Sequence, residues 1–293
     1  MRMLVDARPI VDSRAGGVVR VAREVVTAAA KEFPHDSFVC VTTGWKKPEL
    51  PKGLRDLPNV THAHLQIPNK LWSILAAFSR VSLCSVTMRR TGRIDAVFLP
   101  NLGFFGDLPT DIPTVILLHD LSFLIEPRWF SWKQRLWHFA IGARHLIRSA
   151  ARLLAVSETT MRDATRLLGI PAERIRVIPI GSTLSAPTCS ENGRGTSARS
   201  LLAFGANDPR KNIATAIESV RRLRMHNEFR DVTLTIVGAV HELSLPEWIR
   251  IVARPSDREL VEIYANASVL LYPSWYEGYG LPLHEAASFG IPC

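Results

Sequence analysis

The chain has 293 residues, of which 47% are hydrophobic, and its 36 basic and 27 acidic residues give a net charge of +9. This length allows two domains, and the apolar fraction is that of a globular protein with a sizeable core. The four scattered cysteines have no C-x-x-C spacing, which argues against a zinc site and a disulfide framework. Charge from Arg2 onward argues against a signal peptide, and Arg80 interrupts the best apolar stretch, so no membrane span is expected. The simplest expected location is the cytoplasm.

Positive charge gathers in two segments without acidic residues. Residues 128–152 hold six basic side chains interleaved with five Trp and Phe residues, and a second such segment lies between Lys70 and Arg93. Basic, aromatic helices suit the headgroup region of an anionic bilayer, so Arg128 to Arg152 predict contact with the inner face of the plasma membrane. The alternative is that the aromatic rings pack inward and the arginines form a solvated face. No nucleic-acid motif accompanies the charge, so no nucleic-acid partner is expected.

In the first part of the chain, strand-like segments alternate with helical ones, which predicts an α/β fold with parallel strands. The first helix is expected at Val18–Lys31. The expected strands are Met3–Val5, Ser37–Thr42, Val60–Leu65, Ala96–Leu99, Thr114–Leu118, Arg152–Val156 and Ile175–Ile178. Residues 182–199 are polar and rich in turn formers, which predicts a linker between a first domain, 1–181, and a second, 200–293.

The same pattern restarts after the predicted linker. The expected strands are Leu201–Phe204, Thr233–Val237, Ile249–Val252 and Ser268–Leu271, and the expected helices are Asn212–Met225 and Asp257–Ala265. A doubly wound domain usually carries five or six strands. The second domain is therefore expected to be incomplete at Cys293.

Two basic residues follow the first strand of the second domain. In Asp208-Pro209-Arg210-Lys211-Asn212, Asp208 is a good N-cap and Pro209 a good first helical residue. Arg210 and Lys211 would then lie in the first helical turn, where cations oppose the helix dipole. This predicts a bound anion such as a diphosphate.

The last 25 residues read as a buried strand, a glycine-rich loop and a helix starting at Pro282. Glu277 lies in the loop, and Glu285 lies eight residues later, one turn into the helix. Backbone N–H groups at the start of a helix can bind a phosphate or another oxygen-rich ligand. The two carboxylates are expected to hold different parts of one ligand.

The motif Pro-Ser-x-Tyr-Glu-Gly-Tyr-Gly-Leu-Pro-x-x-Glu-Ala at 273–286 resembles the E-x7-E signature of retaining glycosyltransferases of family 4. Further segments that match in order are Asp6-Ala7-Arg8, Pro100-Asn101, His119-Asp120 and Arg210-Lys211. The resemblance implies the GT-B fold, in which two Rossmann-like domains with parallel sheets face each other across a cleft.

The resemblance also implies roles for individual residues. The catalytic residues would be His119, beside the donor sugar, and Glu277. The donor diphosphate would be bound by Gly16, Gly17, Arg210, Lys211, Gly278, Tyr279 and Gly280, the ribose by Glu285, and the nucleobase by Arg254. Three of these assignments have a structural alternative. His119 could be a structural histidine at a strand end, Gly16 and Gly17 could form an ordinary flexible loop, and Glu285 could be an exposed helix acid. Ser157 is interpreted as the N-cap of a helix beginning near Thr159.

The predicted function is transfer of a hexose, with retention, from a nucleotide diphosphate sugar to a glycan or lipid-linked acceptor in cell-surface polysaccharide or glycolipid synthesis. No cofactor and no metal are expected, because the basic pair and helix N-termini could neutralise the leaving diphosphate. One alternative is an inactive truncated remnant that binds a nucleotide or a partner. Another is a nucleotide-sugar epimerase on the same scaffold.

Overall fold

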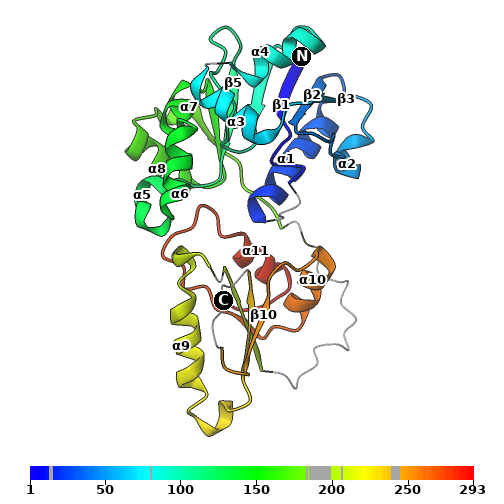
Figure 1. The fold of residues 1–293 in the computed structure, drawn as a ribbon. Helices are drawn as coiled ribbons and strands as arrows, with labels where there is room; N and C mark the ends of the chain where they lie inside the picture. The colour runs from blue at the N-terminus through cyan, green and yellow to red at the C-terminus, as the bar shows by residue number, and fades with distance from the viewer. Residues whose placement is uncertain (13–15, 80, 183, 185–198, 206, 239–244) are drawn as a thin grey trace. The chain divides into compact units, whose positions relative to one another are not determined.

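The computed structural model of the chain describes residues 1–12, 16–79, 81–182, 184, 199–205, 207–238 and 245–293. The chain divides into two compact units, Met1–Ile180 and Gly181–Cys293 (Figure 1). Most of the predicted linker, 182–199, lies outside the described residues.

Unit 1, the residues 1–180, contains a sheet with seven strands among its described residues, and every neighbouring pair is parallel. The strands are β1 (Arg2–Asp6), β2 (Ser37–Thr43), β3 (Val60–Leu65), β4 (Ala96–Leu99), β5 (Thr114–Leu118), β6 (Arg152–Ala155) and β7 (Ile175–Val177). Their spatial order is β3-β2-β1-β4-β5-β6-β7. The order reverses between β1 and β4, and such a switch point opens a crevice outside the carboxyl ends of the strands.

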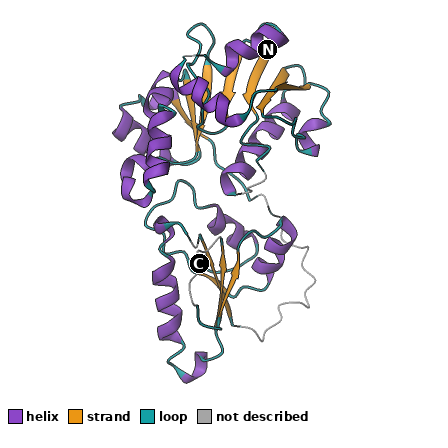
Figure 2. Ribbon diagram, viewed as in Figure 1, coloured by secondary structure: helices purple, strands orange, loops and turns teal. Residues whose placement is uncertain are grey.

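Helices surround this sheet, whose strands lie inside the unit (Figure 2). They are α1 (Gly17–Glu32), α2 (Lys52–Arg55), α3 (Asn69–Phe78), α4 (Leu83–Thr91), α5 (Ser122–Ile125), α6 (Trp132–Ala140), α7 (Ala143–Ser149) and α8 (Glu158–Leu168). Short 3-10 turns lie at η1 (Pro127–Trp129) and η2 (Ala172–Arg174). The strand residues Leu4, Val39 and Ile116 are fully buried, as expected for a parallel sheet that is covered on both faces.

Unit 2, the residues 181–293, contains a four-stranded parallel sheet among its described residues, in the order β10-β9-β8-β11. Its strands are β8 (Ser200–Phe204), β9 (Thr233–Val237), β10 (Ile249–Val252) and β11 (Val269–Leu270), and its helices are α9 (Ile213–Leu223), α10 (Asp257–Ala265) and α11 (Leu281–Ser288), with 3-10 turns η3 (Pro209–Lys211) and η4 (Asn227–Phe229). In both units the predicted strands are confirmed to within one residue at each end.

Both faces of the unit 2 sheet are packed. Along β8, Leu201 and Ala203 belong to an apolar cluster with α9, whereas Leu202 belongs to a second cluster with α10 and α11. Successive strand side chains point to opposite faces, so one strand supplies both clusters. The order of the strands reverses between β8 and β11, which places the switch point of unit 2 at their carboxyl ends.

None of the described helices is by itself long and apolar enough to cross a membrane. Helices α3 and α4 together have the necessary length and apolar composition, but the pair is bent by 114°.

Candidate functional site

The predicted basic pair and the predicted acidic loop meet at the switch point of unit 2. Strand β8 leads into the Arg210 segment and strand β11 leads into the Glu277 loop, and the two strands are hydrogen-bonded neighbours. Two bonds tie the segments directly: Trp275 N–H donates to the Arg210 carbonyl at 2.9 Å, and Asn212 Nδ2 donates to the Pro273 carbonyl at 3.2 Å. Residues 66 positions apart in the chain thus share one site, as the pairing of Lys211 with Glu277 shows.

The basic pair does not lie in the first turn of the long helix, which corrects the sequence prediction. Asp208 caps the separate 3-10 turn η3, where its carboxylate accepts from the Arg210 N–H at 3.0 Å. Helix α9 begins only at Ile213, because Asn212 adopts a left-handed conformation with φ of 51°. An αL residue ends one helical run before another can begin. The two cations therefore precede the α9 dipole.

Each cation of the pair already has a carboxylate partner. Arg210 Nη2 lies 2.9 Å from Asp208 Oδ2, and Lys211 Nζ lies 2.6 Å from Glu277 Oε1. The Lys211 side chain is 15% exposed and that of Glu277 is 20% exposed, so this ion pair is well shielded from solvent. Partial burial strengthens such a pair and fixes its geometry. The predicted phosphate-binding cations are thus held in place by acids of the same unit.

Tyr272 is a third member of this cluster, and the sequence analysis did not assign it a role. Lys211 Nζ donates to the Tyr272 hydroxyl at 3.2 Å and lies 5.2 Å from the centre of its ring. Burial, followed by the nearby Glu277 carboxylate, raises the pKa of Tyr272, so the phenol stays protonated. A tyrosine directly before Pro-Ser at the end of an apolar strand is the signal that could have indicated it.

Gly205 makes the position of Lys211 possible. Its φ is +91°, and a Cβ at this position would overlap the Lys211 side chain. Glycine alone combines this backbone conformation with the required space. The sequence alone did not indicate this role of Gly205, because its contact with Lys211 depends on how η3 folds back.

The glycine-rich loop leads into α11, which begins at Leu281, one residue before the predicted Pro282. Gly280 caps the helix with φ of 82°, a conformation that favours glycine. The Tyr279 ring stacks on the His284 ring at 4.4 Å between centroids. The start of α11 thus lies close to Glu277 in the chain, and backbone N–H groups at the start of a helix favour an anionic ligand.

Glu285 is buried, which excludes the alternative of an exposed helix acid. It is 2% exposed, and its Oε2 accepts from the Tyr264 hydroxyl at 2.7 Å. Tyr264 is itself fully buried between Phe204 and Phe289, whose ring centroids lie 5.6 and 5.2 Å away. A buried carboxylate requires such a partner. The sequence alone did not indicate Tyr264, because its hydrogen bond to Glu285 joins two separate helices, α10 and α11.

In unit 1, His119 follows β5 and joins it to the end of β4. Its Nε2 lies 2.9 Å from the Pro100 carbonyl, and since a carbonyl only accepts, Nε2 carries the proton. Burial lowers the pKa of His119, so the ring stays neutral with Nδ1 unprotonated. The neighbouring Asp120 accepts from the Ser122 N–H and hydroxyl, a local bond pattern at the start of α5. Ser157 caps α8, as predicted, by accepting from the Thr160 N–H.

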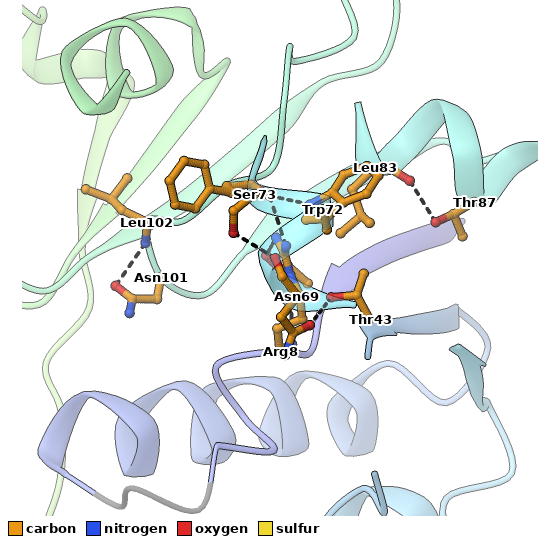
Figure 3. Close-up of polar contacts among 11 residues, drawn as sticks. Arg8, Thr43, Asn69, Trp72, Ser73, Leu83, Thr87, Asn101 and Leu102 are labelled. Carbon is orange, nitrogen blue, oxygen red and sulfur yellow. Dashed lines mark hydrogen bonds and ion pairs between the residues drawn. The ribbon is translucent and has the colours of Figure 1, made fainter. Parts of the chain in front are cut away.

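The switch point of unit 1 carries a polar cluster (Figure 3). Arg8 pairs with Asp6 at 2.6 Å and donates from Nη1 to the Phe104 carbonyl, while Thr43 donates to Asn69 at 2.6 Å. The sequence analysis used Arg8 only as part of the family resemblance.

The predicted glycine loop of unit 1 lies at the start of α1. Gly16 is the N-cap of that helix, with an extended φ of −150°, and no atom lies within 4 Å of the position of a Cβ. Any residue could adopt this backbone, so the conformation itself does not require glycine. What Gly16 provides is open space before the helix N-terminus.

Arg254 lies apart from the cluster of Arg210 and Lys211. It is exposed in the bend after β10, and β9 separates that strand from β8. Its role toward a nucleobase therefore stays a prediction. Among the described residues, no group of three or more His, Cys, Asp or Glu side chains could hold a metal ion.

Two parallel α/β units, with shielded ion pairs at the switch point of the second, define a two-unit α/β protein. Comparison with protein families agrees with this description. Residues 15–185 match the model of Glycosyltransferase Family 4, and residues 190–293 match that of Glycosyl transferases group 1. The chain belongs to Glycosyltransferase Family 4, as the sequence motifs indicated.

Curated relatives include several mannosyltransferases. The O-antigen chain mannosyltransferase B of Escherichia coli is 28% identical over 198 residues, which cover 61% of this chain and 51% of the relative. The MMP alpha-(1->4)-mannosyltransferase of Mycolicibacterium hassiacum is 29% identical over 182 residues, which cover 56% and 42%. The matched part thus spans about half the length of these relatives.

Solved structures share the fold. WaaG, a glycosyltransferase involved in lipopolysaccharide biosynthesis, superposes with a TM-score of 0.68 at 16% identity, covering 100% of this chain and 80% of that one. The sucrose-phosphate synthase of Thermosynechococcus elongatus gives a TM-score of 0.71 at 17% identity, covering 99% and 79%. At these identities the similarity supports the GT-B fold class.

Proposed function

We propose that this chain is a retaining glycosyltransferase that moves a hexose from a nucleotide diphosphate sugar to a hydroxyl of a glycan or lipid-linked acceptor. The observation that carries the proposal is the pair of shielded cations, Arg210 and Lys211, at the switch point between β8 and β11. The mannosyltransferase relatives favour mannose as the hexose and cell-surface polysaccharide or glycolipid synthesis as the setting.

The donor diphosphate would bind to oriented N–H groups rather than to a bare positive charge. The carboxylates of Asp208 and Glu277 balance Arg210 and Lys211. The Lys211 ammonium has three N–H donors, of which Glu277 and Tyr272 engage two, so one can point to a phosphate oxygen. A donor that is fixed in advance stabilises developing charge without reorganising during the reaction.

The chemical step would be a same-face substitution. The bond between the sugar C1 and the phosphate oxygen breaks and leaves its electron pair on the diphosphate, which Arg210 and Lys211 stabilise. The acceptor oxygen bonds to C1 on the face that is being vacated, and the hydroxyl proton passes to the departing phosphate oxygen. This step retains configuration at C1 and requires no covalent nucleophile.

Glu285 would accept hydrogen bonds from the donor ribose. Its carboxylate lies one turn into α11 and is held by the Tyr264 hydroxyl, so its position is fixed before a ligand arrives. A carboxylate can accept two hydroxyl groups of a ribose. We retain His119 as the group beside the donor sugar, and Gly16, Gly17 and the loop Gly278 to Gly280 as phosphate contacts.

We also propose that the enzyme works as a peripheral protein at the inner face of the plasma membrane, with residues 128–152 as its contact. This segment has no acidic side chain, and its helix α6 buries none of its residues. The alternative that the aromatic rings pack inward does not hold for Trp132 and Phe139, which are 64% and 83% exposed.

Turnover of the donor tests the proposed reaction. The purified chain would be given uridine and guanosine diphosphate sugars, with and without membrane lipid, and release of the nucleoside diphosphate would be measured. Release that is lost in Arg210→Ala and Glu285→Ala, but kept in the controls Arg222→Ala and Glu262→Ala, supports the transferase. Donor binding without release indicates a binding module instead.

A further inference from the structure

The exposed apolar surface of this protein is concentrated on two segments of unit 1. Among the described residues, fifteen large hydrophobic side chains are exposed, and nine of them lie between residues 71 and 81 or between 132 and 139. They are Leu71, Ile74, Leu75, Phe78, Val81, Trp132, Leu136, Trp137 and Phe139. Exposed apolar side chains that gather in this way mark an interaction site.

Helix α6 lies on the surface of unit 1. None of its nine residues is buried, and Phe139 and Trp132 are among its most exposed side chains. The ring of His138 anchors the helix by stacking on Phe123 at 4.4 Å, and Ser131 closes a capping box at its start. The helix is thus well formed and contacts the rest of the unit through the rings of His138 and Trp137, while Trp132, Leu136 and Phe139 are exposed.

Helix α3 presents a similar face. Only Trp72 of its ten residues is buried, and Phe78 at its end is 85% exposed. Trp72 Nε1 donates to the Phe104 carbonyl at 2.7 Å, and the Phe104 ring meets the Trp137 ring edge to face at 6.2 Å. Both helices therefore border Phe104. Together α3, Phe104 and α6 form what we call the α3–α6 surface.

The two segments of the chain that carry this surface hold charge of one sign. Residues 57–94 and 127–157 together contain eleven Lys and Arg and no Asp or Glu. Lys70, Lys133 and Arg135 are exposed, and no carboxylate in the described part of the chain forms an ion pair with them. Lys133 Nζ lies 5.7 Å from the centre of the Trp132 ring, so a cation and an indole occur together at the start of α6. Indole and ammonium groups side by side suit the boundary between water and lipid.

We propose that the α3–α6 surface inserts its apolar side chains into the headgroup region of an anionic bilayer, with Lys70, Lys133 and Arg135 on lipid phosphates. This inference rests on the proposed function and deepens it by adding α3 as a second contact and naming the inserted side chains. A second copy of the chain fits less well, because pairing two such surfaces would bring like charges together. The negative charge of lipid phosphates complements the positive charge of the surface.

Sedimentation with vesicles tests the α3–α6 surface. The full chain is mixed with vesicles of phosphatidylcholine alone or with added phosphatidylglycerol. We expect binding only to the anionic vesicles, weakened by salt. Phe78→Ser with Phe139→Ser should reduce the partition coefficient at least about tenfold, because about two buried CH₂ groups correspond to that change. Lys133→Glu should reduce it about fivefold or more.

The matched control is Trp45→Ser, which removes an equally exposed aromatic ring outside the surface. It should leave vesicle binding unchanged, whereas Trp132→Ser should weaken it. Equal binding by both variants, equal binding to neutral vesicles, or self-association that Phe78→Ser abolishes would each overturn the proposal. Release of nucleoside diphosphate without vesicles is measured in parallel, so failure of the membrane contact is distinguished from failure of the transferase.

Discussion

The two units use their cations in opposite ways. In unit 2, Arg210 and Lys211 are each paired with a carboxylate and are 16% and 15% exposed. In unit 1, the cations of the α3–α6 surface are exposed and have no carboxylate partner in the described part of the chain. The paired cations are fixed, which suits a small ligand that must be positioned. The unpaired cations can move, which suits a surface of many similar headgroups.

The net charge of +9 is distributed unevenly between the two units. Unit 2 has 11 Lys and Arg against 12 Asp and Glu, whereas unit 1 has 25 against 15, so the positive charge comes from unit 1. Substitutions in the cluster should therefore change turnover steeply and depend little on salt. Substitutions on the α3–α6 surface should change membrane binding and depend strongly on salt.

The largest effect is expected for Lys211→Ala. It removes a fixed donor to the leaving diphosphate, and loss of one such donor lowers kcat by about 100-fold or more. It also leaves the Glu277 carboxylate without its cation, so the temperature of unfolding should fall. The double variant Lys211→Met, Glu277→Gln should recover the unfolding temperature without recovering turnover. Recovery of both would show that the lysine acts on stability alone.

A smaller loss is expected for Gly205→Ala, which displaces Lys211 without removing it. A displacement of about 1 Å can lower the rate up to about 100-fold. Gly142→Ala is the matched control, because Gly142 also has a positive φ, +61°, but open space around it. The control should lose about 1–2 kcal/mol of stability and keep its turnover. Equal turnover in both variants would contradict the role given to Gly205.

Tyr264→Phe should have a moderate effect that is confined to donor affinity. It keeps the ring packed between Phe204 and Phe289 and removes only the hydroxyl that holds Glu285. We expect the KM for the donor to rise about tenfold, with kcat little changed, because a hydrogen bond to a charged group is worth about 1.5–3 kcal/mol. In the Glu285→Gln variant, Tyr264→Phe should cause no further loss of donor affinity. Additive losses would show that Tyr264 does not act through Glu285.

The smallest effect is expected for the pH dependence of stability, which involves two histidines of unit 1. Burial, followed by Lys47 and His64, lowers the pKa of His62 to about 4, and burial lowers that of His119. The folded state then binds fewer protons than the unfolded state, so stability is full above about pH 6.5 and is lost as the pH falls toward 4. The unfolding temperature of His62→Gln should depend less on pH across this window. An unchanged pH dependence would exclude His62 as a cause.

The sequence predicted the strands closely because most are short apolar runs bounded by turn formers. It also singled out the E-x7-E motif, because Glu277 and Glu285 lie close together in the chain, and the roles given to them stay predictions. It predicted the start of α9 to within one residue but placed Arg210 and Lys211 in the first helical turn, because a left-handed Asn212 has no clear signal beside a strong Asp-Pro helix start. It missed Tyr264 and Gly205 because their contacts with Glu285 and Lys211 join separate elements.

The most direct test of the central claim is calorimetric titration of the chain with nucleoside diphosphates. The account predicts saturable binding that is lost in Arg210→Ala and retained in Arg222→Ala, whose arginine forms an exposed pair with Glu218 on α9. Equal binding by the two variants, or no binding by the unmodified folded chain, would contradict a diphosphate site at the switch point of unit 2.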